Sequence, residues 1–311
     1  MKDLIKVENL VKTYKDLKAV DNLTFSVKEK EIFGLLGPNG SGKTTTINCL
    51  LSLLNYDEGD ITIFGEKMTP TKYHIKEKIG VVFQEVAVFE ELTVRENIDY
   101  FCSLYIKDKK TRFEYVNDAI ELVELTGFVN FKPKQLSGGL LRRLNIACGI
   151  AHKPKLIFLD EPTVAVDPQS RNHILEGIKK LNEDGATIIY TSHYMEEVEF
   201  LCDKILIIDK GKIIASGTKD ELKKLISISL KANFEIENLS KAMLEKISKF
   251  KNVVETSYEG NELFVSFEKT NNLGDFINFL VENKVKYSKI YSELPTLNDV
   301  FLELTGKELR D

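Results

Sequence analysis

The strongest constraint on this chain is a glycine-rich stretch that fits the pattern G-x-x-x-x-G-K-[ST] and reads Gly37-Pro38-Asn39-Gly40-Ser41-Gly42-Lys43-Thr44-Thr45. Residues 32–36 before it have the apolar character of a buried strand, and residues 46–51 after it resemble the first turns of a helix. In such a loop the glycines let backbone N–H groups turn inward around a phosphate, and the helix N-terminus adds a partial positive charge. Lys43 would then reach the β- and γ-phosphates, and the Thr44 hydroxyl would ligate Mg²⁺. A chance match in a chain of average composition has a probability on the order of one per cent, so the stretch predicts nucleotide binding.

The composition is that of an ordinary globular chain and excludes several other classes. The 311 residues suffice for two domains, and a net charge of -5 offers no basic face for nucleic acid. No apolar run approaches the roughly 18 residues of a membrane span, and the N-terminus lacks the apolar core of a signal peptide. We therefore expect a chain that binds no nucleic acid and does not cross a membrane by itself. Widely separated cysteines fit a reducing cytosol rather than a disulfide framework or a metal cluster, and they are Cys49, Cys102, Cys148 and Cys202.

Two further features flank the loop along the chain. Alternating apolar residues between positions 4 and 28 predict half-buried antiparallel strands, and Tyr14 lies between them. An aromatic ring there could stack on adenine, although spacing alone favours an ordinary surface or core tyrosine. From Ile79 a buried-strand pattern ends in Gln84. At the C-terminal end of a central strand this glutamine could help hold Mg²⁺ or the attacking water, and a hydrogen-bonded strand-end amide is the equal alternative.

Residues 90–152 carry apolar positions at helical spacing, which predicts a helical subdomain inserted into an α/β core at about 88–153. The segment closes with Leu136-Ser137-Gly138-Gly139-Leu140. Ser137 is a good helix N-cap, and the glycines let a ligand approach the backbone closely. The pattern therefore fits a second phosphate site and an ordinary capped helix equally well.

A pair of carboxylates follows the next predicted strand. Residues 156–159 are apolar and lead to Asp160 and Glu161, as in a buried parallel strand that delivers acids to its C-terminal end. Asp160 would hold Mg²⁺ through water, and Glu161 would orient or deprotonate the attacking water. His193 follows a later predicted strand and would reach a γ-phosphate, whereas the other histidines are expected on the surface. Those histidines are His74, His152 and His173, and the two later strands are expected at 187–191 and 204–208.

Taken in order, these motifs resemble the ABC-type ATPases, the nucleotide-binding subunits of ABC transporters. The resemblance covers about residues 4–220 and includes the aromatic loop, the phosphate loop, the glutamine loop, Leu-Ser-Gly-Gly, the Asp-Glu strand end, the D-loop and the switch histidine. It implies an α/β fold of the P-loop NTPase class, with a mixed-sheet core, an antiparallel β subdomain and the inserted helical subdomain. It also implies ATP and Mg²⁺ as cofactors.

The resemblance implies a role for each matching residue. In this family two subunits enclose two ATP molecules head to tail, and Ser137 and Gly139 of one subunit complete the phosphate loop of the other. Tyr14 would stack on adenine, and Gln84 would couple Mg²⁺ to the transporter. The implied sites are Lys43, Glu161 and His193 for catalysis; Tyr14, residues 37–45, Gln84, Ser137, Gly138, Gly139 and Asp167 for the nucleotide; and Thr44, Gln84 and Asp160 for the metal.

Two positions depart from the family pattern. Leu140 stands where the family commonly has glutamine, which removes a polar contact at the dimer interface. The D-loop reads Val164-Ala165-Val166-Asp167, where Ala-Gly-Leu-Asp is more usual, but Asp167 is retained. Since neither change touches the predicted catalytic residues, we expect an active ATP hydrolase.

Beyond Gly217 the composition shifts, which predicts an ATPase domain at 1–222 and an α+β accessory domain at 223–311. The tail 295–306 resembles the ending of ATPase subunits of ABC-2 type exporters, and an amphipathic helix docked on its own domain is the alternative. The accessory domain is expected to contain strands at 226–230, 253–258 and 263–267 and helices near 241–250 and 273–283.

The sequence thus predicts a cytoplasmic ATPase, peripheral on the inner face of the cell membrane, that drives export through a separately encoded integral membrane permease. The segment Gln84–Tyr100 is expected to form the groove for a permease helix. The second ATPase subunit is expected to be another copy of the chain or a homologous subunit.

Other functions fit the sequence less well. A soluble ABC ATPase acting on ribosomes usually carries two tandem cassettes, and only one phosphate loop is present. A chromosome-maintenance protein needs a long coiled coil before Ser137, and a regulatory module would have lost Lys43 or Glu161. An ABC importer ATPase remains the closest alternative, because only the C-terminal tail favours export.

Overall fold

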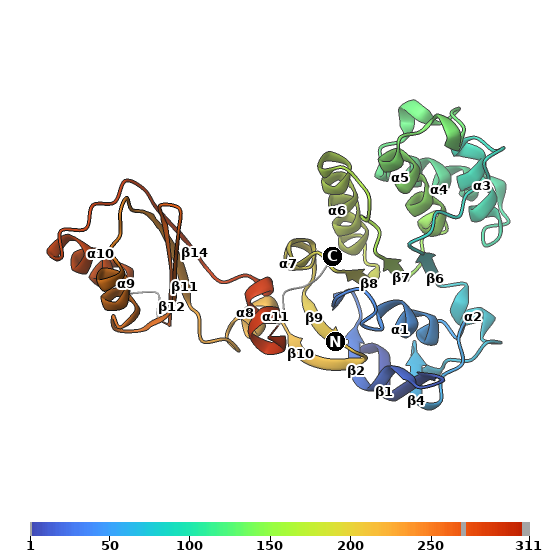
Figure 1. Cartoon of the computed structure of the whole chain (residues 1–311). Coiled ribbons are helices and arrows are strands. Elements are labelled where there is room, and N and C mark those ends of the chain that lie inside the picture. Colours follow the sequence, from blue (N-terminus) through green and yellow to red (C-terminus); the bar gives the residue numbers. More distant parts are fainter. Residues whose placement is uncertain (1, 269–271, 307–311) are drawn as a thin grey trace. The chain divides into compact units, whose positions relative to one another are not determined.

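The computed structural model describes residues 2–268 and 272–306 (Figure 1). The chain divides after Thr218 into two compact units, which are described separately. Within the described ranges, no helix combines the length and the apolar character that crossing a membrane requires.

The first unit begins with an antiparallel sheet that confirms the predicted early strands. Val7 pairs with Phe25 on one side and with Ile61 on the other, so alternate side chains point into the core. Its strands in spatial order are β2 (Leu17–Lys28), β1 (Asp3–Tyr14), β4 (Glu58–Ile63) and β5 (Glu66–Lys67).

A second, mixed sheet carries the predicted buried strands. Five of its strands run parallel, and the sixth, β10, pairs antiparallel with β9 at one edge. β3, β7 and β8 are buried at every residue, as expected for parallel strands covered on both faces. The spatial order is β10 (Lys212–Gly217), β9 (Lys204–Asp209), β3 (Ile32–Leu36), β8 (Thr187–Ser192), β7 (Leu156–Asp160) and β6 (Ile79–Val82).

The expectation that Gln84 ends a central strand is wrong. β6 stops at Val82 and forms an edge of the sheet. Helix α5 (Gly138–Ile150) packs on β6 and buries it, which gives an edge strand the apolar pattern of a central one.

One hydrophobic core joins the two sheets through helix α1 (Lys43–Leu50). Leu35 of β3, Ile47 of α1 and Ile61 of β4 all belong to this core and are fully buried. The phosphate loop is therefore anchored at both ends, because β3 and α1 are held by the same packing.

The predicted helical subdomain is present as three helices that pack on one another (green and cyan, Figure 1). The first begins with a capping box between Thr93 and Glu96, and the last is capped by Ser137. The helices and short 3₁₀ turns of this part are α3 (Val94–Ser103), α4 (Lys109–Leu122), η1 (Thr126–Phe128), η2 (Pro133–Gln135) and α5.

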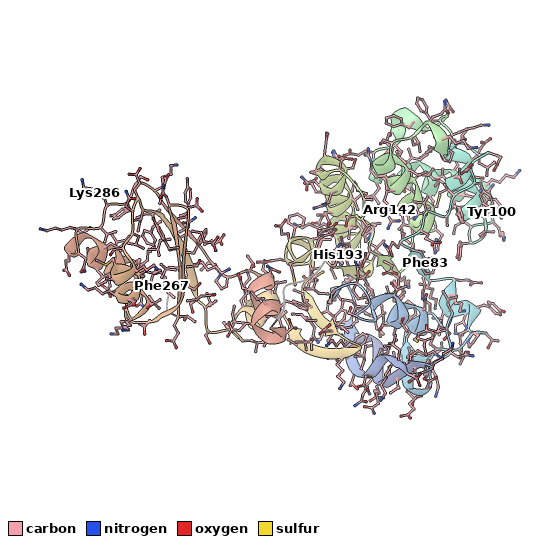
Figure 2. All side chains as sticks on the ribbon, in the orientation of Figure 1. Phe83, Tyr100, Arg142, His193, Phe267 and Lys286 are labelled. Carbon is pink, nitrogen blue, oxygen red and sulfur yellow. The ribbon has the colours of Figure 1, made fainter. Side chains whose placement is uncertain are left out.

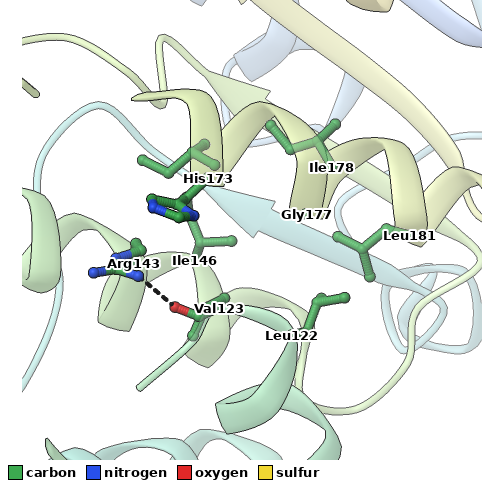
Figure 3. A pocket seen from close by; sticks show the side chains of 9 residues that line it. Leu122, Val123, Arg143, Ile146, His173, Gly177, Ile178 and Leu181 are labelled. Atoms are coloured by element: carbon green, nitrogen blue, oxygen red, sulfur yellow. Dashed lines mark hydrogen bonds between the residues drawn. The ribbon is translucent and has the colours of Figure 1, made fainter. Parts of the chain in front are cut away.

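Three more helices of this unit are α2 (Tyr73–Lys76), α6 (Pro168–Glu183) and α7 (Met195–Leu201). Where the helical subdomain meets α6, apolar side chains leave a small pocket of about 10 Å³ (Figure 3). At its rim Arg143 donates to the carbonyl oxygen of Val123 over 3.2 Å, and His173 of α6 lies beside Ile146 of α5. The two parts of the unit are thus in close contact at this point.

His152 is buried, which contradicts the expectation that it lies on the surface. Its ring stacks on Tyr105 with centroids 3.9 Å apart, and Nε2 lies 3.2 Å from the carbonyl oxygen of Ile79. The residue follows the end of α5, which is buried on most sides, so the chain carries the imidazole inside.

The second unit contains a four-stranded antiparallel sheet in the order β12-β13-β11-β14, the topology of a split βαβ fold. Phe234, Phe267 and Phe276 are fully buried in its own core. The elements are α8 (Lys219–Lys223), β11 (Leu230–Glu235), α9 (Lys241–Ser248), β12 (Val253–Glu259), β13 (Glu262–Phe267), α10 (Asn272–Glu282), β14 (Ile290–Glu293) and α11 (Leu297–Thr305).

One prediction in this unit needs correction. The strand expected at 226–230 is misplaced, because residues 226–229 alternate in polarity but precede β11, which begins only at Leu230. The short edge strand β14 was not predicted. The tail does form an amphipathic helix, α11, whose Val300 and Phe301 are buried.

Candidate nucleotide site

The phosphate loop opens helix α1 with free backbone donors. Gly42 is the N-cap, with a φ of 107°, and a Cβ there would lie 2.3 Å from the carbonyl oxygen of Ala19. Only glycine fits this position. No side chain caps the helix, and no acidic residue stands in its first turn. The first N–H groups of α1 are therefore available to an anion.

Lys43 is buried and its ammonium group points back along the loop. Nζ donates to the carbonyl oxygens of Gly37 at 2.8 Å and Pro38 at 3.2 Å. It also lies 3.1 Å from Oε1 of Glu161. The ammonium is thus fixed between the loop and a carboxylate from another strand.

Glu161 follows β7 in an unusual backbone conformation, with a φ of 47°. Its N–H donates to Oγ1 of Thr191 at 2.9 Å, and its carbonyl oxygen accepts from Nη2 of Arg142 at 2.7 Å. The other carboxylate oxygen, Oε2, lies 3.2 Å from Nδ1 of His193. A left-handed conformation costs a residue with a side chain about 1–2 kcal/mol. The hydrogen bonds of the Glu161 N–H and carbonyl oxygen hold the backbone in this conformation.

Asp160, the neighbouring acid, is 1% exposed, and its Oδ1 accepts from the Thr191 hydroxyl at 2.6 Å. Asp160 and Thr191 are direct partners in the parallel pairing of β7 and β8. Thr191 therefore fixes both acids at the C-terminal edge of the sheet, where the sequence placed them.

The structure brings Lys43, Asp160, Glu161 and His193 together, but Tyr14 and Gln84 make fewer contacts. Tyr14 ends β1 with 45% of its surface exposed, and the Lys12 ammonium lies 5.5 Å from its ring centroid. Gln84 is exposed, and its carbonyl oxygen accepts from Arg142 at 2.6 Å.

A second group forms around the N-terminus of α5. The Ser137 hydroxyl accepts from the N–H of Leu140 at 3.3 Å. A Cβ at Gly139 would lie 2.3 Å from Oγ of Ser170 and 3.0 Å from Oδ2 of Asp167, so glycine lets α5 approach α6 here. Asp167 caps α6 by accepting from the N–H of Ser170. In the described part of the chain no hydrogen bond joins Ser137 or Gly138 to the phosphate loop of the same chain.

Two buried charged residues near the site have no role in the sequence prediction. Arg142 donates to backbone carbonyls on the segments after β6 and β7, including Phe83 at 3.1 Å and Pro162 at 2.8 Å. Figure 2 labels Arg142 and Phe83 in this part of the first unit. Glu197 accepts from the hydroxyl groups of Thr163, in the loop after β7, and Ser192, the last residue of β8. An arginine among the apolar residues of α5 was a usable signal, whereas Glu197 stands in an acidic run without one.

The residues fit a nucleotide and its metal. The uncapped N-terminus of α1, the buried Lys43 and the unpartnered buried Oγ of Ser41 suit phosphate oxygens. Among the described residues no cluster of three or more His, Cys, Asp or Glu could hold a metal. Mg²⁺ takes one or two protein oxygens together with substrate phosphates and water, so it needs no such cluster. The Thr44 hydroxyl and the Asp160 carboxylate are oxygen donors of the kind that this ion takes.

The fold and the site together define a phosphate-loop ATPase. The family model described as ABC transporter matches residues 20–164. The linearmycin resistance ATP-binding protein LnrL of Bacillus subtilis (strain 168) is 40% identical over 311 residues, which cover 99% of this chain and 100% of that protein. The Nod factor export ATP-binding protein I of Burkholderia orbicola (strain AU 1054) is 36% identical over 310 residues, covering 99% and 98%.

A solved structure agrees with these relatives. The ATP-binding cassette MJ0796, a dimer in a post-hydrolysis state bound to ADP and Pi, superposes with a TM-score of 0.63 and 31% identity over 69% of this chain and 98% of that one. The chain therefore belongs to the ABC transporter family, as an ATP-binding subunit that hydrolyses ATP. The predicted family, fold class and enzyme activity are confirmed.

Proposed function

We propose that this chain binds ATP with Mg²⁺, hydrolyses ATP in a dimer and drives export through a separate integral membrane permease. The observation that carries the proposal is the position of the Glu161 carboxylate, 3.1 Å from Lys43 and 3.2 Å from His193. A carboxylate beside a phosphate-binding ammonium group can accept a proton from an attacking water. The resistance and export proteins that match the whole chain favour export over import.

In this proposal Lys43 and the N–H groups of α1 bind the phosphates, and His193 contacts the γ-phosphate. The Thr44 hydroxyl, the Asp160 carboxylate through water and the Gln84 side chain would hold Mg²⁺, which would neutralise phosphate charge when bound. A phosphate at Lys43 competes with Glu161 for the same ammonium, and the Glu161 carboxylate is then released toward water. Tyr14 supplies an exposed ring for adenine.

The dimer is the part of the proposal that uses the second group of residues. Ser137, Gly138 and Gly139 lie at a helix N-terminus beside Asp167, and the hydrogen bonds of the described residues include none from them to their own phosphate loop. A helix N-terminus placed in this way suits the nucleotide of a second subunit. We propose a second copy of this chain as that subunit, with the assembly peripheral on the cytoplasmic face of the membrane.

A hollow in the helical subdomain supports permease docking. It lies between α3 and α4, measures about 600 Å³ and includes Leu92, Tyr100 and Phe113 in its lining. Phe89 and Tyr100 are more than 40% exposed and contact each other edge to face with centroids 4.8 Å apart. Exposed aromatic residues grouped beside a hollow are suited to an apolar helix face of a partner.

The proposal is tested with a tagged Glu161→Gln variant that retains the shape of the side chain but not its basicity. ATP turnover should fall by about 100-fold or more, because a general base contributes 10²- to 10⁴-fold to such reactions. ATP binding should persist. The variant is then purified with ATP from detergent-treated membranes of its own host, and the proteins that accompany it are identified by mass spectrometry.

Co-purification of a protein with several apolar spans supports the exporter, and the gene neighbours of that protein would separate export from import. Glu91→Arg added to the tagged Glu161→Gln variant should weaken the association with the permease. Glu91→Arg alone, in a chain that retains Glu161, should leave ATP turnover unchanged. Recovery with ribosomes or soluble proteins alone would remove the transporter role and leave the ATPase standing.

A further inference from the structure

A buried carboxylate outside the proposed catalytic group joins the loop after β7 to the end of β8. Glu197 of α7 is 2% exposed, and its Oε2 accepts three hydroxyl hydrogen bonds. The donors are Tyr190 at 2.7 Å, Thr163 at 2.8 Å and Ser192 at 2.9 Å. Burial raises the pKa of Tyr190, so its hydroxyl remains a donor. A buried charge is retained at a cost of several kcal/mol unless such bonds compensate it.

The donors stand next to the two groups that face each other across the site. Thr163 lies on the loop that begins with Glu161, and Ser192 directly precedes His193. The Ser192 hydroxyl also accepts from the N–H of Tyr194 at 2.9 Å, which fixes the turn that carries His193. One oxygen atom of Glu197 thus holds the loop after β7 and the end of β8 at a set separation.

A second route reaches His193 from the other oxygen. Oε1 of Glu197 lies 3.3 Å from Nε of Arg171, which is on α6, the helix that Asp167 caps. The Arg171 guanidinium lies over the Tyr194 ring at 4.8 Å, and that ring is 4.1 Å from the His193 ring. The imidazole is therefore supported on its backbone side and on its ring face by groups that Glu197 orders.

We propose that Glu197 is a positioning residue that sets the geometry between Glu161 and His193 and thereby the rate of ATP hydrolysis. The inference rests on the proposed roles of those two residues. Glu197 itself touches none of the phosphate-binding groups, and its effect passes through Thr163, Ser192 and Arg171. A purely structural role for the same carboxylate would affect folding but not the relation between Glu161 and His193.

The test compares Glu197→Gln with Glu196→Gln in the full chain. Glu196 stands beside Glu197 on α7 but is exposed, so the control makes the same chemical change without altering the loops. We expect kcat to fall by roughly 10- to 100-fold in Glu197→Gln, since small displacements of reacting groups have effects of this size. KM for ATP and the kinetics of Glu196→Gln should remain close to wild type, because Lys43 and α1 are untouched.

A second background separates positioning from general destabilisation. If Glu197 acts largely through His193, adding Glu197→Gln to a His193→Ala variant should lower kcat by less than threefold. The imidazole resonances of His193, assigned by their loss in His193→Ala, should shift in Glu197→Gln and stay in place in Glu196→Gln. Ser192→Ala, which leaves the buried charge in place, should reproduce part of the kcat loss if Glu197→Gln folds poorly.

The possible outcomes distinguish this inference from the proposed function. Wild-type protein without Glu161-dependent ATP turnover overturns both. Normal wild-type turnover combined with unchanged kcat in Glu197→Gln and Ser192→Ala overturns the positioning role alone. Equal losses with and without His193, together with unmoved His193 resonances, show a structural role instead.

Discussion

At the scale of single residues, burial determines the protonation state of His152. Burial lowers the pKa of its imidazole to about 4, and the hydrogen bond to the Ile79 carbonyl only partly opposes this. Nδ1 is buried without a hydrogen-bond partner among the described residues, so a second proton there would have no acceptor. The folded chain therefore keeps His152 neutral.

The stability of the first unit should consequently fall as the pH drops from about 6.5 toward 4. In this window the unfolded chain, with an ordinary imidazole pKa near 6.5, binds a proton that the folded chain excludes. The difference corresponds to stability on the order of 3 kcal/mol, with no contribution above pH 6.5 and no further loss below pH 4. Urea unfolding of wild type and His152→Gln between pH 6.5 and 4 measures this loss of stability. If the free energy of unfolding changes with pH in the same way in both proteins, the lowered pKa of His152 is contradicted.

The sequence reveals some of these residue-level features and conceals others. Lys43, Asp160 and Glu161 meet because parallel strands end at the same edge of a sheet, which a strand pattern predicts. The bonds of Arg142 and Glu197 reach backbone or hydroxyl groups far away in the chain, and apolar periodicity carries no information on such partners. The same limit applies to His152, whose burial depends on Tyr105.

Ala165 shows how the structure explains a departure from the family pattern. Its φ is 58°, in the left-handed region that favours glycine. The more usual glycine at this D-loop position therefore relieves a local backbone strain that this chain retains. Nothing in the structure explains the replacement at Leu140, which is half-buried on α5.

At the scale of elements, α5 is held to the two strand ends by one side chain. Arg142 is 4% exposed and donates to five carbonyl oxygens, of which two follow β6 and three belong to the end of β7. Asn145, one turn later, accepts from the N–H of Ala87 at 3.0 Å. The segment with Gln84 and the segment with Glu161 are thus both fixed to the helix that begins at Ser137.

Arg142→Leu should destabilise the first unit by about 3 kcal/mol, because it leaves several buried carbonyls without donors. Arg143→Leu is the matched control, since Arg143 donates to the single carbonyl of Val123, and its cost should be nearer 1 kcal/mol. Arg142→Lys should recover part of the loss, because an ammonium group reaches fewer acceptors than a guanidinium. Chemical unfolding gives the free energy of unfolding of the three variants. Equal losses of stability in Arg142→Leu and Arg143→Leu would refute the role of Arg142 in holding α5 to the two strand ends.

Element prediction failed where burial or alternation had more than one structural cause. β6 has the apolar residues of a central strand because α5 covers it, although it lies at the edge. Residues 226–229 alternate in polarity without strand pairing, whereas β14 is too short and exposed to give a pattern. The helix α5 after Ser137 was foreseen because its N-cap is local chemistry, whereas α3 was predicted from apolar spacing and its cap at Thr93 was not.

At the scale of the whole molecule, each of the two units has a hydrophobic core built from its own described residues. The core of the first unit extends from β1 to β9, and that of the second unit is built on β11, β13 and α10. The division after Thr218 leaves α8 in the second unit, where it packs on α11. The sequence-based boundary at 222/223 instead passes through α8.

These two boundaries make different predictions for the isolated second unit. A fragment of residues 219–311 should fold cooperatively, because its core includes buried residues of β11, α9, β13 and α10. A fragment of residues 223–311 lacks Leu222, which is fully buried, and should be less stable by about 2–4 kcal/mol. Residues 1–218 contain every residue proposed for ATP binding and hydrolysis, and this fragment should retain ATP turnover that Glu161→Gln abolishes. Equal stability of the two C-terminal fragments would place the boundary after α8, and an inactive 1–218 fragment that is folded would show that hydrolysis depends on the second unit.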